Sequence, residues 1–172
     1  MADLRVVPFE PGHLSGVQLR ASARRGLEVL TQTFPMMGQL YAMGGPAWTL
    51  LDGERPLACG GMMRLWPGVA EGWVCPSDEV LSRFPMALVK AVRSGLEEGR
   101  VRLKLRRLQA SIPVDEPWAR RWAAHMGMTE EGLMPAYGPD GRDQLRVARL
   151  WSSAEYESPP SSNPAAEENA AP

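Results

Sequence analysis

The sequence predicts a mixed α/β (α+β) fold built on one central, mostly antiparallel sheet. Residues 47–74 hold three β-rich runs, separated by the turn signals Asp52-Gly53 and Pro67-Gly68, which is the pattern of an antiparallel meander. Residues 85–98 carry apolar side chains at helical spacing between two predicted strands, 71–74 and 101–105. A helix that joins two strands has the geometry of a crossover, so we expect these two strands to be parallel neighbours.

Short elements are predicted before the meander. Residues 4–8 form a first strand, and the apolar spacing over 11–30 predicts two helices, the second with Ser22 as a candidate cap. Pro35 begins another short helix, because the first turn does not use the N–H that proline lacks. Gly44-Gly45 ends it.

Glycine in the third run of the meander has two interpretations. Gly72 either marks an ordinary bulge, or it bends this strand away from its next neighbour and opens a groove. After the meander, Gly99 is a candidate stop for the helix that Pro85 opens. Apolar and basic residues then alternate over 101–106, which predicts a half-buried strand with a one-residue bulge near Arg106-Arg107.

The last elements are one helix and one hairpin. Asp115 is a candidate cap for a helix with Pro117 in its first turn. Trp118 and Trp122 are one turn apart in that helix, a spacing typical of core packing. The turn signals between residues 128 and 151 predict a closing hairpin.

Composition excludes several classes of protein. The net charge of −1 gives no general argument for nucleic acid or an anionic membrane as a partner. No apolar run approaches the ~20 residues of a membrane span, and no apolar stretch of a signal peptide follows Asp3 and Arg5. Cys59 and Cys75 are expected as buried, reduced thiols on neighbouring strands. The cysteines and histidines lack ligand spacing, so no metal site is predicted.

A basic cluster, formed by Arg102, Lys104, Arg106 and Arg107, is the one feature that favours nucleic acid. The alternative is that these side chains are the solvated face of a strand. The near-neutral net charge and the lack of interleaved exposed aromatic residues favour the solvated face. Nucleic acid is therefore not an expected partner.

The composition changes at residue 152. Residues 152–172 are rich in Ser, Pro, Ala and Glu, with four acidic residues and no basic one. Such a segment cannot bury enough apolar surface to order itself. We therefore divide the chain into a folded domain over 1–151 and a low-complexity acidic tail over 152–172. We expect the tail to be a contact segment for a partner chain.

Three phrases carry a resemblance to a known superfamily. They are WTLLDGERPLACGG in the meander, WAAHMGM at a helix end and EGLMPAYGPDGRD before the last strand. With the order of the elements, they resemble the GNAT N-acetyltransferases over residues 1–151, which implies helices on both faces of the sheet. The phrases LRVVPFEPGHL, RLQASIPVD and RRWAAHMGM are most similar to GNAT-like proteins of tailed phages, the internal-virion-protein-A-like group.

The resemblance implies an acetyl-CoA site, whose phosphate loop can be sought in the sequence. The superfamily binds the pyrophosphate with a glycine-rich loop ahead of a helix. Here the corresponding residues 75–84, CPSDEVLSRF, contain no glycine. Asp78 and Glu79 also place negative charge where phosphates would lie.

The same resemblance implies residues that would contact the rest of the cofactor. They are Trp73, Val74, Cys75 and Ser77. The backbone of Trp73 or Val74 would donate a hydrogen bond to the thioester carbonyl.

Groups for acid–base catalysis are sparse. The tyrosine that usually protonates the leaving thiolate in the superfamily corresponds to Ala123, which has no proton to give. Glu71 is the candidate base for the amine, and an exposed strand carboxylate is the alternative interpretation. Tyr137 is the second catalytic candidate, and His125 is the remaining titratable side chain.

The resemblance of fold does not by itself imply activity. Because the glycine-rich loop and the acid are both missing, the sequence favours a virion or assembly component of a tailed phage, with reduced or absent catalysis. Its partners would be other phage structural proteins, and it would be found in the host cytoplasm or the virion. The alternative is an N-acyltransferase that uses acetyl-CoA, the one cofactor implied, to acetylate an amine.

Overall fold

The computed structural model describes residues 2–33 and 36–152 of the 172-residue chain. The helix start predicted at Pro35 lies outside the described residues. So does the acidic tail beyond Ser152.

The described residues form a single seven-stranded sheet, with the strand order β1-β2-β3-β4-β5-β7-β6. Every neighbouring pair in this sheet is antiparallel except β4 and β5, which are parallel. The predicted mixed, mostly antiparallel sheet is therefore confirmed, as are the meander and the closing hairpin. The strands are β1 (Leu4–Pro8), β2 (Ala47–Asp52), β3 (Arg55–Trp66), β4 (Val69–Pro76), β5 (Arg107–Pro113), β6 (Thr129–Met134) and β7 (Gln144–Leu150).

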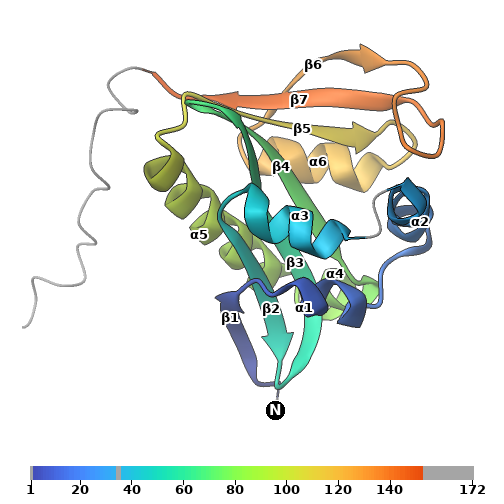
Figure 1. The fold of residues 1–172 in the computed structure, drawn as a ribbon, viewed down its shortest axis with the longest axis vertical. Helices are drawn as coiled ribbons and strands as arrows, with labels where there is room; N and C mark the ends of the chain where they lie inside the picture. The colour runs from blue at the N-terminus through green and yellow to red at the C-terminus, as the bar shows by residue number, and fades with distance from the viewer. Residues whose placement is uncertain (1, 34–35, 153–172) are drawn as a thin grey trace, which may run out of the picture.

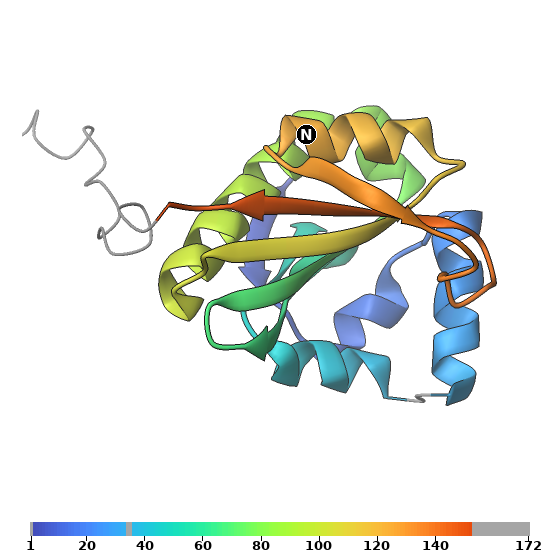
Figure 2. The ribbon, with the colours of Figure 1, turned by 90° about the horizontal axis from the view of Figure 1, so that it is seen from above.

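Helices cover both faces of the sheet, as the resemblance implies. Figures 1 and 2 show α1 and α3 on one face and α5 and α6 on the other, with α2 beside the loop between β6 and β7. None of the helices in the described part of the chain is long and apolar enough to cross a membrane. The helices are α1 (Pro11–Gly16), α2 (Ala21–Thr33), α3 (Met37–Gly44), α4 (Asp78–Arg83), α5 (Pro85–Leu103) and α6 (Pro117–His125).

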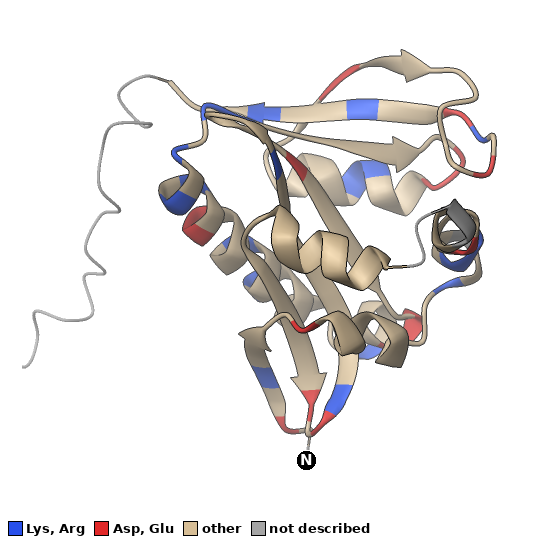
Figure 3. Ribbon diagram, viewed as in Figure 1, with Lys and Arg blue, Asp and Glu red and all other residues tan. Residues whose placement is uncertain are grey.

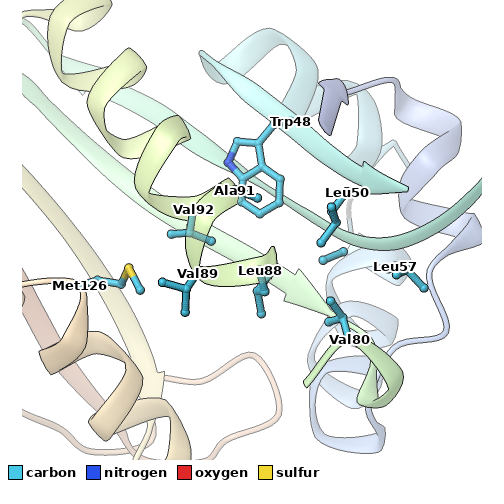
Figure 4. Close-up of a cluster of buried hydrophobic side chains, with 10 residues drawn as sticks. Trp48, Leu50, Leu57, Val80, Leu88, Val89, Ala91, Val92 and Met126 are labelled. Atoms are coloured by element: carbon cyan, nitrogen blue, oxygen red, sulfur yellow. The ribbon is translucent and has the colours of Figure 1, made fainter. Parts of the chain in front are cut away.

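The main core lies between α5 and the sheet (Figure 4), with Trp48 at one end of it. The Trp48 ring is buried between β3 and α5, at two positions that lack a side chain. A Cβ atom at Gly60 or at Gly95 would collide with this ring. The two glycines therefore make the slot in which the indole packs.

The end of α5 corrects two predictions. Gly99 does not end the helix, which continues to Leu103. Gly99 is buried inside the helix because its missing Cβ makes room for the sulfur of Met62. Residues 101–105 are therefore not a strand, and the strand that runs parallel to β4 is β5, from Arg107 to Pro113. The predicted crossover is confirmed, but with a different partner strand.

A cap closes α5 where a bulge was predicted. Lys104 adopts a left-handed conformation, with φ of 49°, and its N–H donates to the carbonyl of Val101. The N–H of Leu105 donates to the carbonyl of Arg100. This pair of bonds is a Schellman motif, with lysine at the position that glycine usually occupies. Alternation over only six residues could not separate this cap from a strand.

Smaller corrections concern the helix caps. The N-cap position of α6 is Glu116, whose side chain makes no capping hydrogen bond, and not Asp115, which forms an ion pair with Arg142. Helix α2 begins at Ala21, so Ser22 lies inside it. Pro117 is in the first turn of α6, as predicted.

Candidate functional site

β4 and β5 are neighbours over only part of their length. Their register partners are Val69 with Arg107, Ala70 with Leu108, and Glu71 with Gln109. The pairing stops just before Gly72, although β4 continues to Pro76 and β5 to Pro113. The two strands therefore form a fork, defined here as residues 72–76 of β4 and 110–113 of β5. This agrees with the interpretation that Gly72 opens a groove.

A cavity of about 470 Å³ occupies the fork. We name it the fork cavity. On the side of α5 and α6 its walls are apolar and include Leu88, Val92 and Met126. The half-buried tryptophans of α6 also line it, so Trp118 and Trp122 are part of the site as well as packing residues.

The residues predicted to contact a cofactor are not all in one place. Trp73, Val74 and Cys75 line the fork cavity, as do the catalytic candidates Glu71 and Tyr137. Ser77 is absent from the lining residues. Its buried hydroxyl accepts a hydrogen bond from the N–H of Val80 at 3.1 Å and so caps α4.

Trp73 is held by aromatic neighbours on the side of α1 and α3. Its ring stacks on Tyr41 with centroids 4.0 Å apart and an interplanar angle of 11°, and Phe9 meets its edge at 5.5 Å. The buried Nε1 of Trp73 has no hydrogen-bond partner among the described residues. Burial raises the pKa of Tyr41, and the nearby Cys75 adds to the effect. This stack closes one wall of the fork cavity with rigid apolar surface.

Glu71 is the centre of a polar cluster at the base of the fork. Its carboxylate oxygens accept hydrogen bonds from Nη1 of Arg146 at 2.8 Å, from Nε2 of Gln109 at 2.9 Å and from Oγ of Ser111 at 3.2 Å. Arg146 also lies 5.6 Å from the centroid of the Tyr137 ring, and its Nη2 is 3.5 Å from the phenol oxygen. The two catalytic candidates are thus joined through Arg146. We call these five residues the Glu71 cluster.

Sequence reasoning missed Arg146, because both faces of β7 are buried. Leu145 and Val147 are buried on one face, and on the other face Arg146 lies between the buried Gln144 and Ala148. A charged residue at an inward-facing strand position must find a partner, because burying an unpaired charge is costly. The consequence is geometric: Arg146, Gln109 and Ser111 fix the position of the Glu71 carboxylate at the base of the fork.

The segment that corresponds to the phosphate loop is folded as α4. Asp78 forms an ion pair with Arg20 at 2.9 Å. Glu79 forms ion pairs with Arg55 and with Arg83, and the hydrogen bond from Arg55 lowers the pKa of this carboxyl group. The negative charge that the sequence places here is therefore neutralised by Arg83 of the same helix and by Arg20 and Arg55 from earlier in the chain.

The remaining titratable candidates do not replace the missing acid. Ala123 is buried in the wall of the fork cavity. His125 is exposed at the end of α6, and its Nε2 lies 3.2 Å from Nη2 of Arg93. Cys59 and Cys75 are register partners with free, buried thiols. Burial raises their pKa values to about 11 and about 12, so both thiols stay protonated at neutral pH.

Among the residues that the structure describes, no group of three or more His, Cys, Asp or Glu side chains could hold a metal ion.

The fork and the order of the strands define the class of fold, which is that of the GNAT N-acetyltransferases. Ard1 from Thermoplasma volcanium superposes with a TM-score of 0.62 at 13% identity, over 86% of this chain and 97% of that one. A ribosomal-protein-alanine N-acetyltransferase from Brucella melitensis gives 0.60 at 15%, over 86% and 99%. A mutant of the spermidine N-acetyltransferase SpeG from Vibrio cholerae gives 0.60 at 15%, over 86% and 93%. No protein-family model and no curated protein matches the sequence.

Acetyl-CoA is the cofactor that this fold implies. The residues of the fork fit its acyl-pantetheine arm better than residues 75–84 fit its phosphates. The apolar fork cavity and the unpaired edge of β4 suit the acyl-pantetheine arm. Residues 75–84 do not form a glycine-rich loop, because residues 78–83 are α4 and the Ser77 hydroxyl accepts a hydrogen bond from the N–H of Val80. Side chains are the more favourable partners for phosphates here.

Proposed function

We propose that this chain binds acetyl-CoA at the fork and is an N-acyltransferase of low activity towards an amine. The observation that carries the proposal is the separation of β4 from β5 after Glu71, with an apolar cavity in the gap. A collapsed fork, with the two strands paired along their whole length, would leave no place for a thioester.

The roles of the residues follow from their positions. Bound acetyl-CoA would supply the activated acetyl group. The backbone of Trp73 or Val74, on the strand edge that β5 leaves unpaired, offers a donor for the thioester carbonyl. Glu71 is at the base of the fork, where an acceptor amine would have to compete for its oxygens. These oxygens already accept hydrogen bonds from Arg146, Gln109 and Ser111, and Ala123 cannot protonate the leaving thiolate. Low activity follows from both.

Calorimetry with acetyl-CoA tests this proposal. We expect binding in the micromolar range and a rise in melting temperature, since a ligand at 100 times its dissociation constant stabilises a protein by about 2.7 kcal/mol. Gly72→Leu should abolish binding, because its side chain would enter the fork cavity beside Leu108. Gly132→Leu is the matched control on β6, where a Cβ meets no atom within 4 Å. No heat and no shift at millimolar acetyl-CoA would contradict the proposal.

We propose as a second candidate that the protein is a component of tailed-phage particles, or of their assembly in the host cytoplasm. Two features favour it. The sequence resembles the phage internal-virion-protein-A-like group, and the acidic segment 152–172 has no means of ordering itself on composition alone. The tail would then contact another phage structural protein with a neutral or basic surface.

Deleting residues 153–172 tests the second candidate. The melting temperature of the domain should stay nearly unchanged, while incorporation of the protein into particles should fall. A variant with the four tail glutamates changed to glutamine keeps the length of the tail and isolates the effect of its charge. If the truncated protein enters particles as well as the full chain does, the tail is not a contact segment.

A further inference from the structure

A second cavity, of about 760 Å³, lies between α4, the start of α5 and α6. It shares Arg20, Leu88, Trp118 and Trp122 with the fork cavity, so the two spaces have a common wall. A ligand with an apolar arm in the fork could therefore place its other end here. We call this space the α6 cavity.

The α6 cavity holds one arginine whose charge is not matched by a carboxylate of the described residues. Its two carboxylates are already matched, Asp78 by Arg20 and Glu79 by Arg55 and Arg83. Arg121 lines the same cavity, is exposed, and makes no ion pair with any residue of the described part of the chain. His125 lines it too and adjoins a further arginine, Arg93. Among the described residues that line the cavity, Arg20 and Arg121 are cationic and Asp78 and Glu79 are anionic, and Arg121 is the arginine whose charge no ion pair matches.

Arg121 differs from its neighbour on α6 in what it faces. Arg120 forms an ion pair with Glu130 on β6 at 2.7 Å. Arg121, the next residue, lines the α6 cavity and has no such partner. Figure 3 shows the blue of Lys and Arg in the middle of α6. The same helix therefore presents one neutralised guanidinium and one that is available to a ligand.

Backbone groups at the start of α5 do not supply an alternative anion site. Pro85 has no N–H, and the N–H groups of Ala87 and Leu88 both donate to the carbonyl of Phe84. Side chains are therefore better placed than the start of α5 to bind an anion in the α6 cavity. Guanidinium groups are well suited to phosphate because they form paired, charge-assisted hydrogen bonds.

We propose that Arg121, together with Arg93 and His125, binds the phosphates of acetyl-CoA in the α6 cavity, in place of a glycine-rich loop. This inference rests on the proposed binding of acetyl-CoA at the fork. It explains how a chain without glycine in residues 75–84 can hold a phosphorylated cofactor. The carboxylates of α4 do not oppose it, since each is paired with arginine.

The test compares acetyl-CoA with acetyl-pantetheine, which has the same acyl arm but no phosphate. Calorimetry would be run on the full chain, on Arg121→Ala and on Arg120→Ala as the matched control. We expect Arg121→Ala to weaken acetyl-CoA binding roughly tenfold, because a charge-assisted bond is lost. Acetyl-pantetheine binding should not change. Arg120→Ala removes an equal charge from the same helix and should leave both affinities unchanged.

Salt gives an independent readout. The affinity of the unmodified protein for acetyl-CoA should fall as salt rises, because exposed charges are screened. That dependence should be smaller for Arg121→Ala and absent for acetyl-pantetheine. Arg121 is exposed, so its replacement should leave the melting temperature unchanged.

Two results would overturn the inference, and they are distinguishable. If acetyl-CoA binds and Arg121→Ala behaves like Arg120→Ala, the phosphates bind elsewhere while the proposed function stands. If the unmodified protein binds neither acetyl-CoA nor acetyl-pantetheine, the proposed function fails and this inference fails with it.

Discussion

Replacing Trp48 by alanine should lower the free energy of unfolding by about 3–5 kcal/mol, the range for truncating a large buried aromatic side chain. Only 9% of Trp48 is exposed, and its ring fills the slot between Gly60 and Gly95. Neither glycine has a side chain that could move into the space. The cavity left behind would stay open, which adds to the cost. Denaturant titration, followed by circular dichroism, measures the change.

Trp66→Ala is the matched control for this experiment. Trp66 ends β3, the strand that packs next to Trp48, but 54% of it is exposed. The same substitution should therefore cost less than about 1 kcal/mol. Equal losses for the two variants would show that the slot around Trp48 is not tightly packed.

Breaking the pair of Glu71 and Arg146 should cost about 2 kcal/mol for either single alanine variant. The side chains are 27% and 18% exposed, so each charge left alone would be poorly solvated. Fully buried pairs cost ~3–5 kcal/mol to break, and the residual exposure reduces that figure here. The double variant should cost much less than the sum of the two single variants, because it leaves neither charge unpaired.

The pair of Arg120 and Glu130 provides the comparison cycle. Its side chains are 47% and 43% exposed, and exposed pairs contribute ~0–1 kcal/mol. We therefore expect little coupling in this second cycle. If both cycles gave the same coupling energy, the Glu71 cluster would be an ordinary surface ion pair and Glu71 would be free to act as a base.

The hydrogen bonds that the Glu71 carboxylate accepts matter for both candidate functions. A carboxylate with bonds from Arg146, Gln109 and Ser111 is suited to holding a positive charge near the fork. A substrate amine would have to displace one of these donors to reach the carboxylate oxygens. Binding of a thioester and slow acyl transfer are therefore compatible in one site. Binding of a thioester is also compatible with a structural role of the protein in a particle.

Local signals in the sequence determined much of the fold. Asp52-Gly53 and Pro67-Gly68 define tight turns through residues that need no distant partner, so the meander could be predicted from residues 47–74 alone. The helix between two strands predicted the parallel crossover, because its geometry allows few alternatives. The groove at Gly72 was one of two interpretations of a glycine in a strand, and the end of pairing after Glu71 supports it.

Where a pattern fits two structures, only the tertiary structure decided between them. Alternation over residues 101–106 suits a strand as well as the last turn of a helix with its cap. The contact of Gly99 with Met62, which is distant in sequence, favours the helix. The position of β5 then follows, because the Schellman cap at Lys104 ends α5 just before Arg107.

Charge was the other property that the linear sequence could not settle. Asp78 and Glu79 appear there as a repulsive pair, but Arg20, Arg55 and Arg83 neutralise them. Arg20 and Arg55 come from earlier parts of the chain, which lie near α4 only when the chain has folded. In the same way Glu71 meets Arg146 only because β7 lies beside β5. The sequence by itself determined which groups are present and where the chain turns. The tertiary structure decided which charges are paired, because ion pairs depend on distances in space and not on separation along the chain.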